Sequence, residues 1–346
     1  MRLRHSMAAL LFSVLLGFPG AIRCTATELQ QKTLEAFDRY VRFTEARREE
    51  LRANGSFLWL DSLPEPRRKQ LYDRLRRGQL EIRQEKIEED GNPVEVPDGL
   101  IHDWSGVVFI PGVSLDRVVA LLHDYNNHCH TYAPDVRRSK LLEHADDTFK
   151  VYLQFYKESP RHVSFNTLFE VHDTRIDATH SISRAISVRI AELEHPDQPD
   201  SSEFPVGQGH GYLWRLNNYW RLEQKDGGVY VQVETIALSR DVPAIFAWFV
   251  NPLIRRVSRH TVANLLTATR RGLVNSATNR TTPGQMGSLP GISDSACGRR
   301  ERRQIQFCSN LWALKLLLTK VLTGHPNSRD GPCWIMWRRE IVVKSK

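Results

Sequence analysis

The residues best suited to chemistry in this 346-residue chain are few and scattered. Four potential metal ligands, His123, His128, Cys129 and His130, lie in one short segment, but their spacing fits no standard zinc signature. We therefore interpret them as polar residues near a helix end and expect no metal. The chain also lacks a G-x-S-x-G motif, a P-loop and a dinucleotide-binding glycine fingerprint. The sequence thus assigns no catalytic residue and indicates no cofactor. It does not exclude acid–base catalysis, because such chemistry needs no contiguous motif.

Arg184 is the most informative charged residue, because it lies in a strand-like segment, 180–192. It could bind a carboxylate or carbonyl group of a ligand. The alternative is a structural ion pair with Glu170 or Glu234. This alternative is favoured, because buried charges are usually paired. Strict alternation places Arg184 on one face with Ile182, Ile186, Val188 and Ile190.

The segment from 211 to 223 carries two alternating sets of side chains. We expect the tryptophan face to line a pocket because it carries fewer charges, and ordinary core packing is the alternative. The next strand alternates valines with Tyr230, Gln232 and Glu234, and its inward face is left open. The tryptophan face is Tyr212, Trp214, Leu216, Asn218 and Trp220, and the other is Leu213, Arg215, Asn217, Tyr219 and Arg221.

Periodicity predicts the elements that position these residues. Helical spacing indicates an amphipathic helix over 27–51 and a second helix from Pro66 to Gly78. Neither is apolar enough to stand alone, so we expect them to form an extension packed on the main domain. Later elements are strands at 80–87 and 99–110, a short helix capped by Ser114, a strand pair within 136–156, strands at 163–172, 180–192, 211–223 and 228–239, and a long helix from Pro243 to Leu273.

This order, with strings such as FIPGVSLDRVVALLHDY and GYLWRLNNYWRLEQKDGGVYV, resembles the START/Bet v 1-like (SRPBCC) superfamily. That superfamily includes polyketide cyclases and aromatases, and the local text is similar to a bacterial group of unassigned function. The resemblance covers 101–274, with 80–87 as an added strand. It implies an α+β helix-grip fold, in which a curved antiparallel sheet of about seven strands wraps a long C-terminal helix. The fold implies a cavity and says little about chemistry.

A cavity between such a sheet and helix predicts binding of a hydrophobic or amphipathic small molecule of the lipid, polyketide or isoprenoid class. One alternative is a cyclase- or aromatase-like enzyme in the same cavity, and another is an envelope interaction or scaffold protein. The expected lining residues are Val151, Leu153, Phe165, Phe169, Arg184, Ile186, Trp214, Trp220, Ile245 and Phe249.

The two ends of the chain differ from its middle. Residues 1–26 have the basic, apolar and small-residue layout of a signal peptide, so we expect a secreted or periplasmic protein. The tail, 275–346, contains the whole formal charge of +8, with one basic-then-apolar segment that could lie on a membrane surface. The remainder is near neutral, which argues against nucleic-acid binding. We thus predict an extension at 27–79 and a helix-grip domain at 80–274. The oligomeric state is not indicated.

Overall fold

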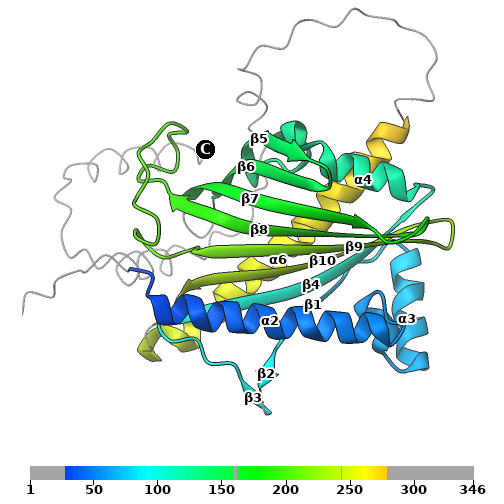
Figure 1. Ribbon diagram of the computed structural model, residues 1–346, viewed down its shortest axis with the longest axis horizontal. Coiled ribbons are helices and arrows are strands. Elements are labelled where there is room, and N and C mark those ends of the chain that lie inside the picture. The colour runs from blue at the N-terminus through cyan, green and yellow to red at the C-terminus, as the bar shows by residue number, and fades with distance from the viewer. Residues whose placement is uncertain (1–27, 90, 159–161, 243, 279–346) are drawn as a thin grey trace, which may run out of the picture. The chain divides into compact units, whose positions relative to one another are not determined.

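The computed structural model describes residues 28–89, 91–158, 162–242 and 244–278. Its centre is an eight-stranded antiparallel sheet with the order β1-β4-β10-β9-β8-β7-β6-β5 (Figure 1). The strands from β5 to β10 form a meander, and β4 joins its last strand to β1. The strands are β1 Glu81–Gln84, β4 Gly99–Pro111, β5 Val136–Ala145, β6 Thr148–Lys157, β7 Val163–Arg175, β8 His180–Glu192, β9 Arg215–Lys225 and β10 Gly228–Arg240, with a separate two-stranded ribbon of β2 Glu88–Glu89 and β3 Asn92–Pro93.

A 35-residue helix, α6 (Ala244–Thr278), lies across one side of this sheet, which we call the inner face (Figure 1). Valine side chains of β10 pack there against Val262, Leu266 and Leu273 of the helix. The sequence left the inward face of the strand 228–239 undecided. In the structure, Val229, Val231 and Val233 point toward the inner face. The inner face is also covered by α4 Leu115–His123, η2 Tyr125–Asn127 and α5 His128–Thr131.

The opposite side of the sheet, the outer face, is covered by the N-terminal helices. Phe37, Tyr40 and Val41 pack against Ile236 and Leu238 of β10. A second cluster joins the next helix to β4 and β10 through Leu71 and Tyr230. The sheet is therefore buried on both faces over its β4, β10 and β9 strands. The covering elements are α2 Gln31–Ala53, η1 Trp59–Ser62 and α3 Glu65–Arg76.

Local sequence features explain the main turns and contacts. The Ser114 side chain accepts a hydrogen bond from the backbone N–H of Arg117 and so caps α4 as expected. Asp226 and Gly227 both have positive φ, as a tight turn between β9 and β10 requires. Gly106 allows the closest approach of helix and sheet, because a Cβ there would lie 2.6 Å from Cγ1 of Val262.

The predicted helix-grip architecture is confirmed by this strand order and by the long helix across the inner face. The sheet has eight strands, which agrees with the predicted sheet of about seven and the added strand at 80–87. The predicted strand 211–223 begins later, at Arg215, because its ladder with β10 starts there. No described helix is both long and apolar enough to cross a bilayer. The predicted signal peptide and nearly all of the predicted tail lie outside the described residues.

Candidate functional site

Five of the predicted lining residues lie on the inner face. Val151 and Phe169 pack with Tyr125, which belongs to η2. Phe165 is opposite Phe155 in the sheet, and Phe155 packs with Leu265 of α6. The five residues are Val151, Leu153, Phe165, Phe169 and Trp220.

The inner face is less completely covered over β6, β8 and β9 than over β1, β4 and β10. α6 makes its main sheet contacts with β4, β1 and β10, where the valines of β10 are fully buried. On β6, β8 and β9, by contrast, several inner apolar side chains remain only half-buried. These are Leu153, Phe155, Ala185 and Leu216.

Three side chains with hydrogen-bonding groups, Trp104, Thr235 and Asn218, lie side by side on β4, β10 and β9 of the inner face. Thr235 lies opposite both Trp104 and Asn218, and its hydroxyl donates a hydrogen bond of 2.8 Å to Oδ1 of Asn218. Trp104 is only 8% exposed, and its buried Nε1–H donates to no described residue. An unpaired buried donor costs about 1–3 kcal/mol, so the indole N–H would gain from an acceptor on a bound molecule.

Sequence reasoning did not identify Trp104, although the signal was present. The segment GLIHDWSGVVFI places Trp104 on one face with Gly106, Val108 and Ile110. The glycine on that face marks a close approach of another element. Recognising that approach would have placed the tryptophan under the covering helix.

A second polar group on the inner side combines His123 and Asp173. His123 ends α4, and its Nε2 is hydrogen-bonded to Oδ2 of Asp173 on β7. The imidazole lies beside the Phe149 ring, with 4.8 Å between the ring centroids. Oδ1 of Asp173 is buried and has no hydrogen-bond partner among the described residues. A carboxylate that orients an imidazole is an arrangement suited to proton transfer.

The other members of the histidine segment have structural surroundings. Burial lowers the pKa of His128 to about 4, and its Nε2 is 3.1 Å from the carbonyl oxygen of Leu122. The ring is therefore neutral at physiological pH and can donate that hydrogen bond. Within the described part of the chain, no cluster of three or more His, Cys, Asp or Glu residues could hold a metal ion.

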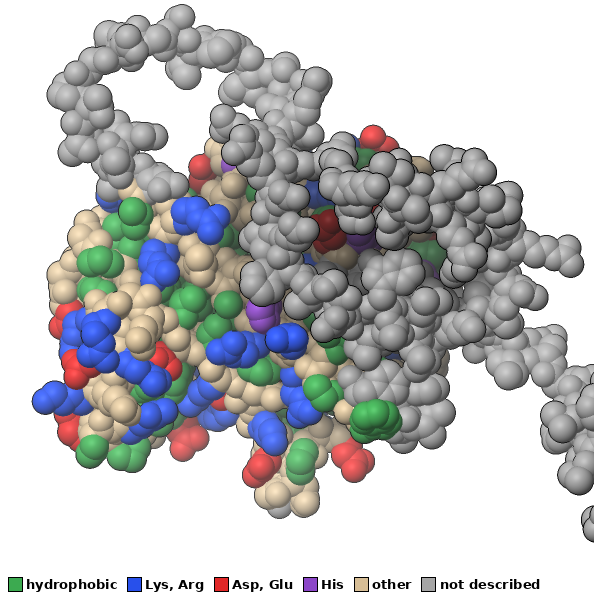
Figure 2. Space-filling view, turned by 180° about the vertical axis from the view of Figure 1, so that it is seen from behind, with side chains coloured by type: hydrophobic (Ala, Val, Ile, Leu, Met, Phe, Trp, Pro, Cys, Tyr) green, Lys and Arg blue, Asp and Glu red, His purple; other side chains and the backbone are tan. Residues whose placement is uncertain are grey.

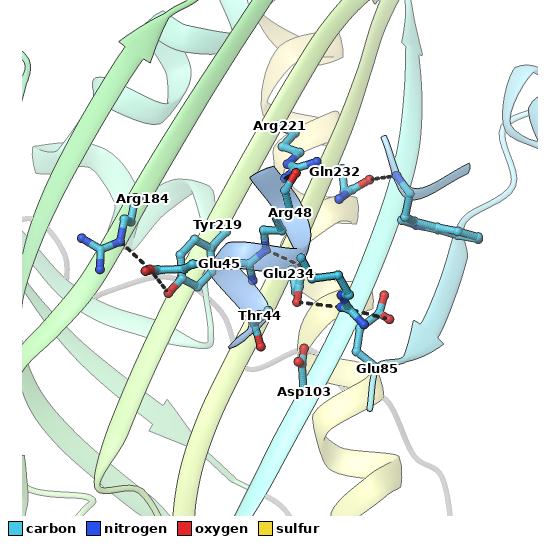
Figure 3. A network of polar contacts seen from close by, with 12 residues as sticks. Thr44, Glu45, Arg48, Glu85, Asp103, Arg184, Tyr219, Arg221, Gln232 and Glu234 are labelled. Carbon is cyan, nitrogen blue, oxygen red and sulfur yellow. Dashed lines mark hydrogen bonds and ion pairs between the residues drawn. The ribbon is translucent and has the colours of Figure 1, made fainter. Parts of the chain in front are cut away.

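Arg184 lies on the outer face, so the expectation that it lines the cavity is wrong. Its Nε donates to Oε1 of Glu45 on α2 at 2.8 Å, and the Tyr219 hydroxyl donates to the same oxygen (Figure 3). The ion-pair interpretation was thus right in kind, but the partner is Glu45. The cause is a bulge in β8: Phe169 is opposite Ser187, whereas its neighbour Leu168 is opposite Arg189.

The same bulge accounts for Ile186, which also faces outward and packs in the cluster around α2. Trp214 belongs to that cluster too, because it precedes the first β9 ladder pair and does not follow the strand alternation. Both expectations of an inner position are therefore wrong. Ile245 and Phe249 lie in α6, but their side chains are outside the described set.

The charges around α2 form one buried network on the outer face (Figure 3). Arg48 donates from Nε to Oε2 of Glu234 at 2.9 Å, and the Tyr40 hydroxyl donates to Oδ2 of Asp103. Burial, reinforced by the negative charges of Glu234 and Glu85, raises the pKa of Asp103. Burial opposes ionisation of Glu234, but the charge and hydrogen bond of Arg48, together with the charges of Arg47 and Arg221, outweigh it and lower the pKa of Glu234. This network fastens α2 to the sheet and does not open onto the inner face.

No family model matches the chain, and no curated protein matches it significantly. Solved structures of similar fold include a STAR-related lipid transfer protein from Xanthomonas axonopodis, with 19% identity and a TM-score of 0.37 over 55% of this chain and 98% of the other. Human STARD10 shares 9% identity over 63% and 83%, with a TM-score of 0.38. The Zhui aromatase/cyclase from Streptomyces sp. R1128 shares 12% over 53% and 98%, with a TM-score of 0.33. At these values the likeness concerns the fold alone.

Proposed function

We propose that this helix-grip protein binds a hydrophobic or amphipathic small molecule on the inner face, between the sheet and α6. The observation that carries the proposal is the buried indole N–H of Trp104, which has no acceptor among the described residues and lies in the core cluster under α6, where Ile82 and Leu265 are only partly buried. A guest that supplies a carbonyl or hydroxyl oxygen would satisfy this donor. Lipids, polyketides and isoprenoids have such a combination of groups.

The expected affinity comes mainly from apolar contact. Removing about 200 Å² of apolar surface from water contributes about 5 kcal/mol at roughly 25 cal/mol per Å². One hydrogen bond from Trp104 would add about 1 kcal/mol and fix the orientation of the guest. Phe155 and Leu216 supply apolar surface in the half-buried region.

The experiment is a binding cycle that varies protein and guest together. An alkyl ketone and the alkane of equal length are titrated against the wild type, Trp104→Phe and Trp59→Phe. Trp59 is the matched control, because its buried Nε1–H also lacks a partner in the described chain but lies with α3 on the outer face.

We expect the wild type and Trp59→Phe to prefer the ketone by about five- to tenfold, the value of one hydrogen bond. Trp104→Phe should bind both guests equally. If no apolar molecule binds, the proposed function is refuted, and native mass spectrometry of the purified protein should then show no retained guest. An equal ketone preference in all three proteins would reject the role of Trp104.

A second candidate, cyclase-like catalysis on the same face, is favoured by the His123–Asp173 pair. There the imidazole would remove a proton from a carbon next to a carbonyl, and Asp173 would hold the ring. Cyclisation of a model polyketone, followed by absorbance, tests this function. A rate that His123→Gln does not lower would leave binding without catalysis.

We further propose that the protein is exported, because residues 1–26 have the signal-peptide layout. N-terminal sequencing of the protein from the extracellular or periplasmic fraction should begin at Thr27. An intact Met1 in protein from the cytoplasm would refute export.

A further inference from the structure

The first half of α6 carries an unusual concentration of unpaired positive charge. The helix contains five arginines and no Asp or Glu residue over 244–278. Arg255, Arg256 and Arg259 are all exposed, and none forms an ion pair or hydrogen bond with another described residue. Figure 2, which views the molecule from the α6 side, shows more Lys and Arg than Asp and Glu side chains on this face.

This arrangement differs from that of the N-terminal helices. On α2, Arg52 pairs with Glu49, and on α3, Arg76 pairs with Asp73. These pairs at a spacing of three residues are the usual way in which an exposed helix balances its charges. Among the described residues, Arg255, Arg256 and Arg259 have no such partners, so their positive charge is available to an external anion.

The same half of α6 exposes a large aromatic side chain. Trp248 is 78% exposed, far more than any other large apolar residue of the described chain. It precedes Arg255 by seven residues and Arg259 by eleven, which correspond to about two and three helical turns. Tryptophan is enriched where membranes meet water, because its ring is apolar and its N–H is polar.

One side of the first half of α6 is exposed although it continues the side that packs on the sheet further along. A spacing of seven or eleven residues returns to nearly the same side of a helix, so Arg255 shares a side with Val262 and Leu266. Val262 and Leu266 are buried against the sheet, whereas Arg255 is exposed. The side of α6 that carries Arg255 is therefore accessible before residue 262, although Val250 is buried.

We propose that Trp248, Arg255, Arg256 and Arg259, the α6 basic patch, bind a membrane surface rich in anionic phospholipid. Phospholipid headgroups supply the negative charge, and the headgroup boundary accommodates the indole ring. An exposed indole beside the arginines favours a lipid surface over a nucleic acid. The inference stands independently of a guest on the inner face.

The test is cosedimentation of the full chain with vesicles, which measures a partition coefficient. One set of vesicles contains phosphatidylcholine alone, and the other contains 30 mol% phosphatidylglycerol. The variants are R255Q/R256Q/R259Q, Trp248→Ala and a matched control, R42Q/R67Q/R77Q. The control removes three exposed charges from α2, α3 and the residue that follows α3.

We expect wild type to bind the anionic vesicles far better than the neutral ones. Each arginine near an anionic surface contributes about fivefold, so R255Q/R256Q/R259Q should lose about 100-fold in partitioning. Trp248→Ala should lose several-fold, and the control should bind as wild type does. Thermal unfolding of each variant establishes that it is folded.

Three results would overturn the inference. Wild-type partitioning by R255Q/R256Q/R259Q would assign any membrane contact to the basic tail. An equal loss in the control variant would reduce the effect to total charge. Binding of duplex RNA as tight as that of anionic vesicles, with loss in the same triple variant, would assign the patch to nucleic acid.

Discussion

Gly106 is the position at which a single added methyl group should disturb the contact between α6 and the sheet. A Cβ at this residue would lie 2.6 Å from Cγ1 of Val262 and 2.7 Å from Cδ1 of Leu266. Ordinary carbon contacts are about 3.5–4.0 Å, so the helix must move outward by about 1 Å or the two side chains must leave their rotamers. Such overpacking costs about 1–3 kcal/mol.

The assay is urea unfolding of Gly106→Ala, Val262→Ala and the double variant. Gly106→Ala should lose about 1–3 kcal/mol at an unchanged m-value. Val262→Ala alone removes two methyl groups, at about 2 kcal/mol. Because it also makes room for the new Cβ, the double variant should be more stable than the sum of the single effects by about 1 kcal/mol or more.

The opposite outcome is physically possible, which makes the experiment decisive. Where the native site has room, replacing glycine by alanine stabilises a protein by about 0.4–1 kcal/mol, because it reduces the conformational entropy of the unfolded chain. If Gly106→Ala stabilises the protein, or if the two substitutions are strictly additive, the close packing of α6 on β4 is refuted. The proposed binding face would then lack its defined cover.

Three further predictions concern other contacts. Arg48→Met should lower the free energy of unfolding in urea by about 3–5 kcal/mol, because it leaves Glu234 charged and buried. The double variant R48M/E234L should recover most of this loss. A destabilisation as large in the double variant would contradict the ion-pair argument. Burial lowers the pKa of His128 to about 4, so in this pH range the unfolded chain binds a proton that the folded chain does not. The free energy of unfolding should therefore fall by about 3 kcal/mol as the pH drops from about 6.5 to 4. Equal pH dependence of the unfolding free energy in wild type and His128→Asn would reject this. Gly272→Ala should stabilise α6 by about 0.5–1 kcal/mol, because alanine favours a helix and the nearest atoms to its Cβ belong to side chains, with Cδ1 of Leu121 at 3.2 Å. A lowered melting temperature would show that Leu121 cannot move aside.

The elements of this fold could be predicted from sequence because their signals are local. The spacing of Val262, Leu266 and Leu273 specifies a helix with one buried side, and Asp226-Gly227 specifies the tight turn. The role of the N-terminal helices was predicted only in outline. That α2 covers the outer face depends on pairings such as Arg48 with Glu234, which are 186 residues apart and carry no local signal.

The faces of the strands were the harder problem, and Arg184 and Trp104 show why. Alternation assigns a face only as long as the ladder is regular, and one bulge reverses the assignment for every residue on its far side. Arg184 and Ile190 therefore point to opposite faces, although six residues separate them. An arginine next to isoleucines looked like a ligand anchor because strict alternation placed it on their face, whereas it points to the outer face, where α2 supplies Glu45. On the inner face, Trp104, which carries no charge, is a side chain with a buried hydrogen-bond donor that is unpaired among the described residues. A polar group is thus informative about ligands only after its face, and every element that covers that face, has been established.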